Sequence, residues 1–356
     1  MEKPEKTLRK PARGTKIEWA THTVNWLAGC TKISPACTNC YAEVMTARLA
    51  TMPNAPARYR EGVVSDRRWT GRIAYDVNAL HQAFADLESS RDPRRVFINS
   101  MSDTFHEDAP PESLEELALA IDLHDQCWFR SDTGCERLDA VGYDISTMEM
   151  PTRGRRSCIM LLTKRPDRLL AWQREHFPDG LPSWVWVGCT VEDQRRADER
   201  LDHLLNVHAR VHFASVEPLL GPLDLEEWMP GPRADGTDNF RGLSWLIVGG
   251  ESGPGARPMH PDWARLLRNQ CAAAGVPFLF KQWGEWRPGV GWPLGASGFG
   301  TDRGVSRGDD GTSQIFSDRR FYESAVVPMF RPGKHTAGRL LDGRTWDEFP
   351  GEVRGA

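Results

Sequence analysis

Short runs of apolar residues recur along the chain, and each run is apolar at both odd and even positions. A strand with one exposed face would show polar residues at every second position, so these runs predict strands buried on both faces. The predicted strands are Val96–Ser100, Ile159–Thr163, Val185–Val191, Val211–Val216, Trp245–Gly249 and Phe278–Gln282. A first strand near Thr23–Ala28 brings their number to about seven.

Segments with a helical pattern of apolar residues separate these strands. They are Pro111–His124, Pro166–His176, Asp193–Asn206 and Pro261–Ala274. Regular alternation of strand and helix is typical of βαβ units and a parallel sheet, so the predicted fold class is α/β. We expect a full or partial (β/α) barrel of the TIM type, with parallel strands, an inserted segment and a C-terminal extension. A doubly wound open sheet also fits this pattern.

Stretches that depart from the alternation set the predicted domain organisation. Residues 1–16 carry six Lys or Arg and almost no apolar side chains, so they are expected to form a basic flexible arm. The barrel is expected over 17–287, with an insertion at 129–156 where a short connection would suffice. Gly284–Gly311 is rich in glycine and predicts a flexible loop, and 288–356 is expected to form an extension that packs on the barrel.

Composition narrows the class of protein. With 356 residues, 40% hydrophobic residues and 14 Trp, the chain can bury a large core, which excludes a mainly disordered or fibrous protein. No apolar stretch reaches the roughly 18 residues of a membrane helix, and the N-terminus lacks the apolar run of a signal peptide, so we expect a cytoplasmic protein without a membrane partner. The net charge of -4 gives no general attraction for polyanions. The 37 Arg against 8 Lys suit specific phosphate contacts, although genomic GC bias has the same effect.

Three of the eight cysteines lie close together, in the segment GCTKISPACTNCYAE, between the first predicted strand and a predicted helix at Ala42–Leu49. Cys30, Cys37 and Cys40 could converge on one metal centre, because thiolates are soft ligands for both iron–sulfur clusters and zinc. A zinc site usually has a fourth Cys or His ligand, and His22 is a weak candidate. A [4Fe-4S] cluster with one open iron position is therefore favoured over zinc, and over thiols that bind no metal.

Motifs along the chain resemble those of a known family. In order they are TKIEW, GCTKISPACTNCYAE, FINSMSD, LLTKRP, VGCTVEDQ, SVEPLLGP, WLIVGGESGPGARP and FLFKQWGEW, over roughly residues 15–287, with RLLDGRTWDEFP in the tail. Together with the three-cysteine loop after the first strand, they resemble a phage-associated family of the radical S-adenosylmethionine superfamily. The usual loop of that superfamily has three residues between its first two cysteines, whereas six separate Cys30 from Cys37 here. Asn39 stands at the usual aromatic position before the last cysteine, and Tyr41 follows that cysteine instead.

The resemblance implies both cofactors and chemistry. It implies that Cys30, Cys37 and Cys40 hold a [4Fe-4S] cluster whose fourth iron binds S-adenosylmethionine (SAM), with Tyr41 as a further cofactor contact. An electron donor such as a flavodoxin or ferredoxin would reduce the cluster, and a 5′-deoxyadenosyl radical formed from SAM would remove a hydrogen atom from the substrate. The protein itself would bind and orient the cofactors and the substrate, and would exclude water from them.

Polar residues directly follow the predicted strands, where a barrel of this kind carries its chemistry. The candidates for binding SAM are Asn99, Ser100, Ser102, Asp103, Thr163, Lys164, Glu192 and Glu217. Asn99–Asp103 would meet the amine and carboxylate of SAM, and the other residues its carboxylate and ribose hydroxyls. The alternative is that these residues cap the following helices, as Ser102 or Asp103 could do.

Three further residues are candidates for substrate binding or catalysis. Glu251 lies in a GGE element like the one that binds the methionine amine in the superfamily, but after a late strand, so it is placed on the substrate side. Lys281 could anchor a substrate or extend its ammonium group to solvent along an apolar stem. Cys189, at the end of a predicted strand, could donate a hydrogen atom to a substrate radical or be a small buried apolar residue.

The resemblance and the arginine content together indicate a substrate class. A phage-associated enzyme rich in Arg points to DNA as partner, and to rearrangement or modification of a hypermodified thymine base, which has to be extruded if the DNA is duplex. Lesion repair resembling that by spore photoproduct lyase is an alternative. A protein of another class, a nucleic-acid-binding module stabilised by zinc at the three cysteines, also fits. If the protein is phage-encoded, it is expected in the host cell cytoplasm.

Overall fold

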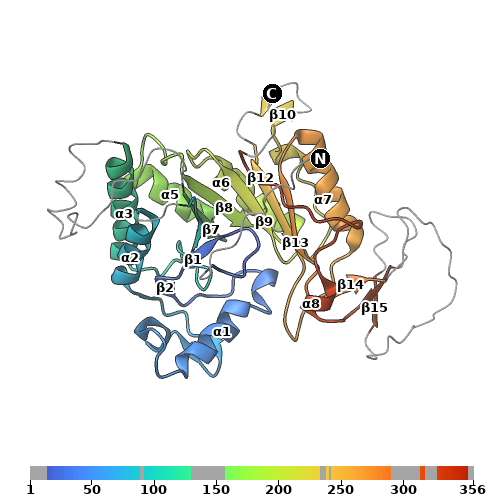
Figure 1. Cartoon of the computed structure of the whole chain (residues 1–356), viewed down its shortest axis with the longest axis horizontal. Helices are drawn as coiled ribbons and strands as arrows, with labels where there is room; N and C mark the ends of the chain where they lie inside the picture. The colour runs from blue at the N-terminus through green and yellow to red at the C-terminus, as the bar shows by residue number, and fades with distance from the viewer. Residues whose placement is uncertain are drawn as a thin grey trace, which may run out of the picture.

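A seven-stranded parallel sheet forms the centre of the protein (Figure 1). The computed structural model describes residues 14–88, 92–129, 157–232, 238–239, 242–289, 313–316 and 327–351. The strands of the sheet, in spatial order, are β1 (His22–Val24), β6 (Arg95–Ile98), β7 (Cys158–Thr163), β8 (Val185–Thr190), β9 (His212–Val216), β12 (Trp245–Gly249) and β13 (Phe278–Gln282). Every neighbouring pair is parallel.

The strands follow one another across the sheet in the same order as along the chain. A doubly wound sheet reverses direction at a switch point, so that alternative is excluded. Because crossovers between parallel strands are right-handed, connections that never reverse place the helices on one face and let the sheet curl around the other. With β1 and β13 as the edges of the described sheet, the predicted α/β fold is confirmed as a partial barrel, a half-barrel of parallel strands.

Helices cover the convex face of the half-barrel (Figure 1). They are α2 (Val77–Glu88), α3 (Pro111–Phe129), α5 (Pro166–His176), α6 (Gln194–Leu205) and α7 (Pro261–Ala274). The bounds of α5 and α7 agree with the predicted segments, and α6 begins after Asp193, whose side chain accepts a hydrogen bond from the Arg196 N–H at 2.9 Å. Helix α2 is an addition to the predicted set, although Leu80, Phe84 and Leu87 have the spacing of a buried helix face.

Smaller elements surround the sheet. The short helices are α1 (Tyr41–Ala50), α8 (Lys334–Ala337), η1 (Pro35–Cys37), η2 (Ala57–Tyr59) and η4 (Glu226–Trp228). The antiparallel pairs are β2 (Leu27–Ala28) with β5 (Ala74–Tyr75), β3 (Val64–Ser65) with β4 (Arg68–Trp69) and β10 (Gly231–Pro232) with β11 (Asp238–Asn239). A three-stranded antiparallel sheet contains β14 (Arg287–Pro288), β16 (Val327–Phe330) and β15 (Ser313–Phe316).

The first predicted strand, Thr23–Ala28, is divided in the structure into β1 and β2. The division has a tertiary cause. The side-chain oxygen of Asn99 accepts hydrogen bonds from the backbone N–H groups of Trp26 and Leu27, both at 3.1 Å. These two N–H groups therefore leave the parallel ladder, and the chain turns away toward the end of the sheet.

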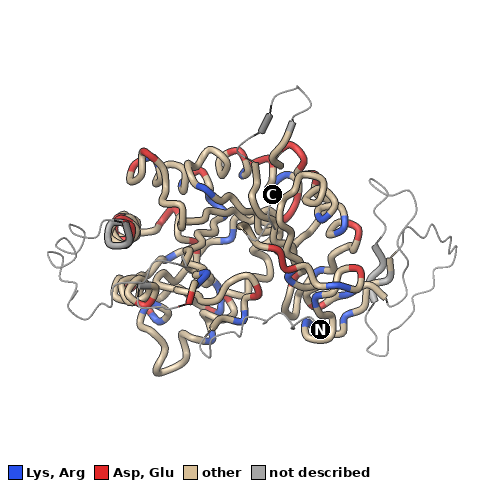
Figure 2. Tube along the Cα trace, turned by 45° about the horizontal axis from the view of Figure 1, so that its top comes forward, with Lys and Arg blue, Asp and Glu red and all other residues tan. Residues whose placement is uncertain are grey.

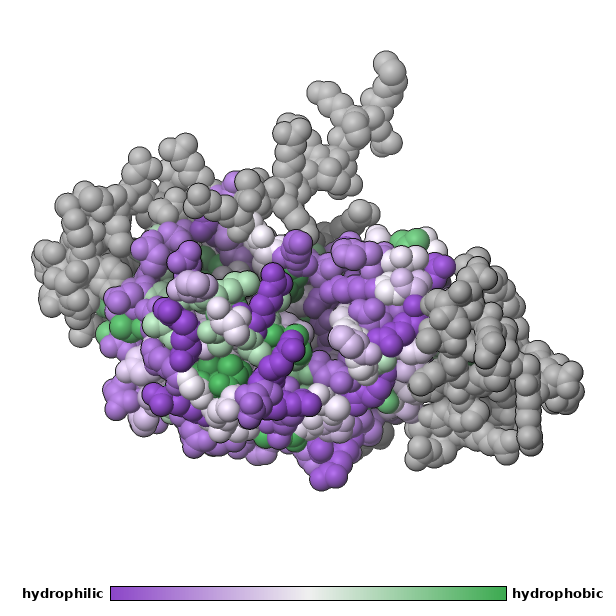
Figure 3. All heavy atoms as spheres, turned by 90° about the horizontal axis from the view of Figure 1, so that it is seen from below, coloured by the Kyte–Doolittle hydropathy of each residue, from purple (hydrophilic) through white to green (hydrophobic). Residues whose placement is uncertain are grey.

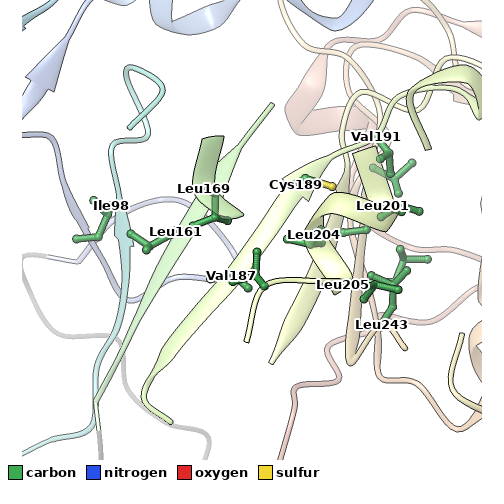
Figure 4. Close-up of a cluster of buried hydrophobic side chains, with 14 of the residues drawn as sticks. Ile98, Leu161, Leu169, Val187, Cys189, Val191, Leu201, Leu204, Leu205 and Leu243 are labelled. Carbon is green, nitrogen blue, oxygen red and sulfur yellow. The ribbon is translucent and has the colours of Figure 1, made fainter. Parts of the chain in front are cut away.

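The side chains of the sheet divide between two apolar layers. Val187 and Cys189 of β8 belong to the layer that packs against the helices, together with residues of α6 (Figure 4). The neighbouring Trp186 belongs to the layer on the concave face, where Trp19 stacks 4.6 Å from Phe97 between ring centroids. This concave layer fills the interior of the half-barrel along the strands, before the polar residues that follow them.

Charged residues are almost confined to helices and loops, and the central strands are nearly all tan in Figure 2. Within the described central sheet, Arg95 and Lys281 are the only Lys, Arg, Asp or Glu residues. Arg95 begins β6 and Lys281 lies next to the end of β13. Polar chemistry is thus concentrated where the strands end.

The segment around Asp347 lies along the outer edge of β13. Asp347 forms an isolated antiparallel bridge with Leu279, and the Phe280 N–H donates to the carbonyl of Trp346 at 3.0 Å. The Phe278 N–H donates to the Glu348 carboxylate at 3.0 Å. The first three residues of this edge, Phe278–Phe280, are therefore paired with the tail.

Three predicted segments lie largely outside the described residues. The basic arm at 1–16 is described from residue 14, the insertion at 129–156 at Phe129 alone, and the loop Gly284–Gly311 as far as Gly289. They remain predictions, as does the division into arm, barrel and extension. Among the described helices, none combines the length and apolar character needed to cross a membrane.

Candidate functional site

The three-cysteine loop lies across the C-terminal ends of the first sheet strands. Gly29 forms an isolated parallel bridge with Ser102, which follows β6. Two residues further on, the Thr31 hydroxyl accepts a hydrogen bond from Arg165 Nη2 at 2.8 Å, and Arg165 follows β7. The beginning of the loop is thus attached to the ends of two neighbouring strands.

The second half of the loop contacts the ends of β8 and β12. The Ala36 N–H donates to Glu192 Oε1 at 3.3 Å, and Glu192 follows β8. Asn39 Nδ2 donates to the Gly255 carbonyl at 2.7 Å, in the loop after β12. A Cβ at Gly255 would lie 2.5 Å from Asn39 Oδ1, so a larger residue there would have to displace the Asn39 side chain. The loop therefore spans the mouth of the half-barrel.

Cys30, Cys37 and Cys40 are all free thiols. Cys37 is buried, and the other two are partly exposed. The loop is held by Thr31, Ala36 and other residues between the cysteines, so its attachment does not consume the thiols. In the part of the chain that the structure describes, no three Cys, His, Asp or Glu side chains are grouped so as to hold a metal ion.

The surroundings of the thiols differ in charge. Burial, reinforced by the nearby Asp103 carboxylate, raises the pKa of Cys30 to about 12. Burial also acts to raise the pKa of Cys37, but the Lys164 ammonium and hydrogen bonds from the loop, including one from Ser34, outweigh it and lower that pKa. The surroundings of Cys37 thus ease its ionisation, whereas those of Cys30 oppose it.

Asn99, Ser100 and Ser102 lie at the mouth as predicted, but their side chains bind within the protein. Asn99 has a positive φ of 58°, which asparagine tolerates, and its amide holds the chain between β1 and β2. The Ser100 hydroxyl donates to Asn25 Oδ1 at 3.0 Å, and the Ser102 hydroxyl donates to the Leu27 carbonyl at 3.1 Å. These three side chains connect strand ends to one another.

Asp103 is the centre of a buried hydrogen-bond network. Its Oδ1 accepts from the Thr163 hydroxyl at 2.6 Å and from the Phe105 N–H at 3.1 Å. Its Oδ2 accepts from the Lys164 N–H at 3.1 Å and from Arg165 Nη1 at 2.9 Å. With four donors around it, this carboxylate joins the end of β6 to the end of β7, and Thr163 serves the same junction.

Arg165 extends this network to the cysteine loop. The guanidinium is buried and pairs with Asp103, with the Glu107 carboxylate and with the Thr31 hydroxyl. Thr31 in turn donates to Glu107 at 3.0 Å and lies 2.9 Å from His106 Nε2. Burial acts to raise the pKa of Glu107, but the hydrogen bond from Arg165 outweighs it and lowers that pKa to about 2.

Glu192 is fully buried and pairs with Arg200 of α6. Arg200 Nη1 lies 3.0 Å from Glu192 Oε2 and donates to the Thr190 carbonyl at 2.7 Å. The other carboxylate oxygen accepts from Ala36 N–H, one residue before Cys37. The predicted cofactor ligand Glu192 therefore positions the middle of the cysteine loop.

Glu251 is buried and engaged within its own loop. Its two oxygens accept from Arg257 Nη2 at 2.6 Å and Nε at 2.8 Å, a bidentate pair. Arg257 Nη2 also donates to the Pro35 carbonyl at 3.0 Å. Glu251 thus fixes Arg257, which contacts the cysteine loop, and the Glu251 carboxylate is engaged in this ion pair.

Glu217 and Lys281 meet at the end of the sheet opposite β1. Lys281 Nζ donates to Glu217 Oε2 at 2.9 Å, and Gln282 Nε2 donates to Oε1 at 3.1 Å. A Cβ at Gly249, on the strand between them, would lie 3.2 Å from the Glu217 carboxyl carbon. The small residue leaves room for the carboxylate above β12.

Tyr41 begins α1 with its hydroxyl and ring in different surroundings. The hydroxyl donates to the Ser100 carbonyl, whereas the side chain as a whole is 56% exposed. Desolvation of the hydroxyl, together with the negative charges of Cys40 and Glu217, raises the pKa of Tyr41. The ring is therefore held in one orientation at the mouth.

Cys189 does not lie with the mouth residues. It has the same parity on β8 as Val185 and Val187, is fully buried and packs in the helix-facing layer (Figure 4). Burial raises the pKa of Cys189 to about 12. Of the two alternatives for Cys189, the structure favours the small buried apolar residue, because the strand turns this side of its backbone toward α6.

Sequence reasoning missed several residues that assemble the site. They are Thr31, Glu43, Glu107, Arg165, Arg200 and Arg257. A signal for one of them was present, because Arg165 directly follows Lys164 at the end of a predicted strand. Arg200 and Arg257 lie eight and six residues from their partners Glu192 and Glu251, whereas Thr31 and Glu107 meet Arg165 from far away in the sequence.

Comparisons with known proteins give a family and one distant structural match. A family model described as "Protein of unknown function (DUF5131)" matches residues 14–134 and 143–350. No curated protein matches the chain. A solved structure of a spore photoproduct lyase mutant with bound AdoMet and dinucleoside spore photoproduct matches with a TM-score of 0.34 and 10% identity, over 88% of this chain and 69% of that chain. Function therefore has to be inferred from the site.

Proposed function

The chain belongs to the DUF5131 family, and we propose that it is a radical SAM enzyme whose [4Fe-4S] cluster is held by Cys30, Cys37 and Cys40. The observation that supports this proposal is the position of the cysteine loop. Three free thiols lie in one loop that is fixed to the ends of β6, β7, β8 and β12, across the mouth of a half-barrel. Ligands and chemistry in such barrels lie at that end.

The donor set fits a cluster of this kind. Thiolates are the usual ligands of iron–sulfur clusters, and three of them leave one iron for an exogenous ligand. The Lys164 ammonium lowers the pKa of Cys37, which favours the thiolate that a cluster needs. Cys30, Cys37 and Cys40 are the residues that would hold the cluster, although among the described residues they are not already grouped as a metal site.

Residues at the mouth would bind and orient SAM. Lys164 and Glu217 are placed there, while Tyr41, Asn99, Ser102 and Asp103 hold the strand ends. A cluster held there and reduced by a donor such as a flavodoxin or ferredoxin would supply one electron to the sulfonium of SAM, whose C–S bond then breaks to give methionine and a 5′-deoxyadenosyl radical. The filled apolar layer around Trp19 and Trp245 closes the other end of the half-barrel against water.

The proposed substrate is a base in DNA, most specifically a hypermodified thymine that is rearranged or modified. The open side of a half-barrel admits a large molecule that presents one group, as an extruded base would. Anaerobic incubation with SAM, reductant and either phage or unmodified DNA, followed by mass spectrometry of the nucleosides, tests this substrate. A new nucleoside that requires all components supports it, and turnover of free nucleoside alone contradicts it.

Metal analysis after anaerobic purification tests the cluster. We expect a brown protein with about four iron and four sulfide per chain, and loss of most iron in Cys30→Ala, Cys37→Ala and Cys40→Ala. Cys271→Ala is the matched control, because Cys271 is a buried thiol of α7. About one zinc per chain in a colourless protein would contradict the proposal and favour a zinc-stabilised module.

A further inference from the structure

One face of α1 is apolar and exposed, which is the reverse of an ordinary surface helix. Tyr41, Val44 and Met45 are 56%, 58% and 43% exposed, and Arg48 continues the same face at helical spacing. The opposite face, which includes Glu43, is buried. Figure 3, seen from the side on which α1 lies, shows apolar side chains gathered among hydrophilic ones beside a hollow in the surface. We call Tyr41, Val44, Met45 and Arg48 the α1 stripe.

The α1 stripe is held rigidly from beneath. Glu43 Oε2 lies 2.7 Å from Lys32 Nζ of the cysteine loop and 3.3 Å from Arg68 Nη1 of the β3–β4 hairpin. Its Oε1 accepts from the Trp69 N–H at 3.0 Å. At the start of the helix, the hydroxyl of Tyr41 is bonded to the Ser100 carbonyl. The aromatic ring is thus presented in a fixed position next to the proposed cluster ligands.

The region that carries the stripe is basic, although the chain as a whole is acidic. Residues 30–76 contain seven Lys or Arg and four Asp or Glu, against a net charge of -4 for the chain. Glu43 and Asp76, two of the four acids, are engaged in ion pairs. The exposed arginines are Arg48, Arg60, Arg67, Arg68 and Arg72. A narrow apolar stripe that ends in Arg48, on a region with a net positive charge, is complementary to an anionic partner with apolar faces.

We propose that the α1 stripe binds a single nucleic-acid strand, namely the nucleotides that flank the base presented to the mouth. This inference rests on the proposed function and extends it. Bases stack on exposed aromatic rings without regard to sequence, and the planar guanidinium of Arg contacts phosphate bidentately. Tyr41 would stack a base, Val44 and Met45 would contact the next one, and Arg48 would meet the backbone.

The size of the stripe favours a strand over a protein. A stable protein–protein interface usually involves some 20–30 residues on each side. The α1 stripe offers four side chains along one ten-residue helix. A few stacked nucleotides match this width, and Arg48 supplies a positive charge on the stripe itself.

Fluorescence anisotropy with a labelled single strand of about 15 nucleotides tests the proposal, using the full chain without SAM. We expect Tyr41→Ala to weaken binding about tenfold, and Tyr41→Phe, which keeps the ring, to bind within about twofold of the parent. Arg48→Ala should reduce the slope of log affinity against log salt by about 0.7. The matched controls are Leu119→Ala on α3, which is 40% exposed, and Arg174→Ala on α5, both expected to bind like the parent.

Parent-like binding by both Tyr41→Ala and Arg48→Ala would overturn the proposal. Competition by polyglutamate as strong as that by unlabelled strand would also overturn it, and would point to an acidic protein as the occupant. Iron content is measured on the same samples. A protein that contains iron but does not bind the strand would contradict the α1 stripe as a nucleic-acid site and leave the proposed cluster standing. A protein that binds the strand but contains no iron would contradict the cluster and leave the α1 stripe standing.

Discussion

Arg165 donates a hydrogen bond to the Thr31 hydroxyl at 2.8 Å, although 134 residues separate them in the sequence. The same guanidinium pairs with Asp103 and Glu107, so one side chain joins the ends of β6 and β7 to the residue next to Cys30. The geometry of the first cysteine therefore depends on two distant strand ends.

Replacing Arg165 should destabilise the protein and release the cysteine loop. Arg165→Met keeps the length of the side chain but leaves the buried Asp103 without its charged partner, which typically costs about 3–5 kcal/mol of unfolding free energy. Urea unfolding measures the loss, and iron analysis measures the loop. Arg168→Met, which loses one bond to the Phe105 carbonyl, is the control and should change the unfolding free energy by about 1 kcal/mol. Equal effects of the two variants would show that Arg165 has no special role.

The ion pair of Glu107 predicts a specific acid dependence. The pKa of Glu107 falls from 4.5 to about 2 on folding, because the hydrogen bond from Arg165 outweighs burial. A depressed carboxyl pKa contributes stability that is complete above 4.5 and is lost as the pH falls toward 2. Unfolding midpoints measured across this window should fall less steeply for Glu107→Gln than for the parent.

Glu199→Gln supplies the control for the acid series. Glu199 pairs with Arg195 on the exposed face of α6, where such a pair contributes little. The unfolding midpoint of Glu199→Gln should fall with decreasing pH as steeply as that of the parent. If the unfolding midpoint of Glu107→Gln falls as steeply with decreasing pH as that of the parent, Glu107 is not the group responsible for the acid dependence.

Gly29 should be irreplaceable. Its φ is +103°, and a Cβ would lie 2.0 Å from the carbonyl oxygen of Arg72, so an alanine there has to displace backbone next to Cys30. We expect Gly29→Ala to lose more than about 2 kcal/mol in urea unfolding and to bind less iron. Gly221→Ala is the matched control, because a Cβ at Gly221 meets no atom within 4 Å. A Gly29→Ala protein as stable as Gly221→Ala would contradict this account.

Cys189→Ala should leave iron content and turnover unchanged, because the thiol packs against α6 and not at the mouth. The expected effect is on stability alone, a loss of about 1 kcal/mol from the small cavity. Activity measured at a temperature well below the unfolding transition separates the two effects. Loss of turnover with full iron and a folded protein would restore Cys189 as a hydrogen-atom donor.

The fold was largely predictable because its signals are local. β12 and β13 have the predicted bounds, since strands buried on both faces stand out as continuous apolar runs. The break between β1 and β2 was not predictable from the sequence, because it depends on the amide of Asn99, which lies more than seventy residues away. Strand parity showed that Cys189 and Val187 share a face, but only packing decides which face meets the helices.

The site was predictable in place and less so in role. The cysteine loop and the polar residues after each strand lie at the predicted end of the sheet. What Asp103 or Glu192 does depends on Arg165 and Arg200, and a carboxylate looks the same in a sequence whether it meets a ligand or an arginine. Residue type therefore predicted where these carboxylates lie, whereas their roles depend on which side chains they pair with in three dimensions.

The backbone pairing between β13 and the segment at Trp346–Glu348 also concerns solubility. An open half-barrel has two strand edges, and an unpaired edge is a template on which another chain can add a strand and aggregate. The bridge from Asp347 to Leu279 and the bond from Phe280 to Trp346 occupy that template on one side. Backbone groups of β13 that bond to the tail of the same chain are not free to pair with a strand of another chain.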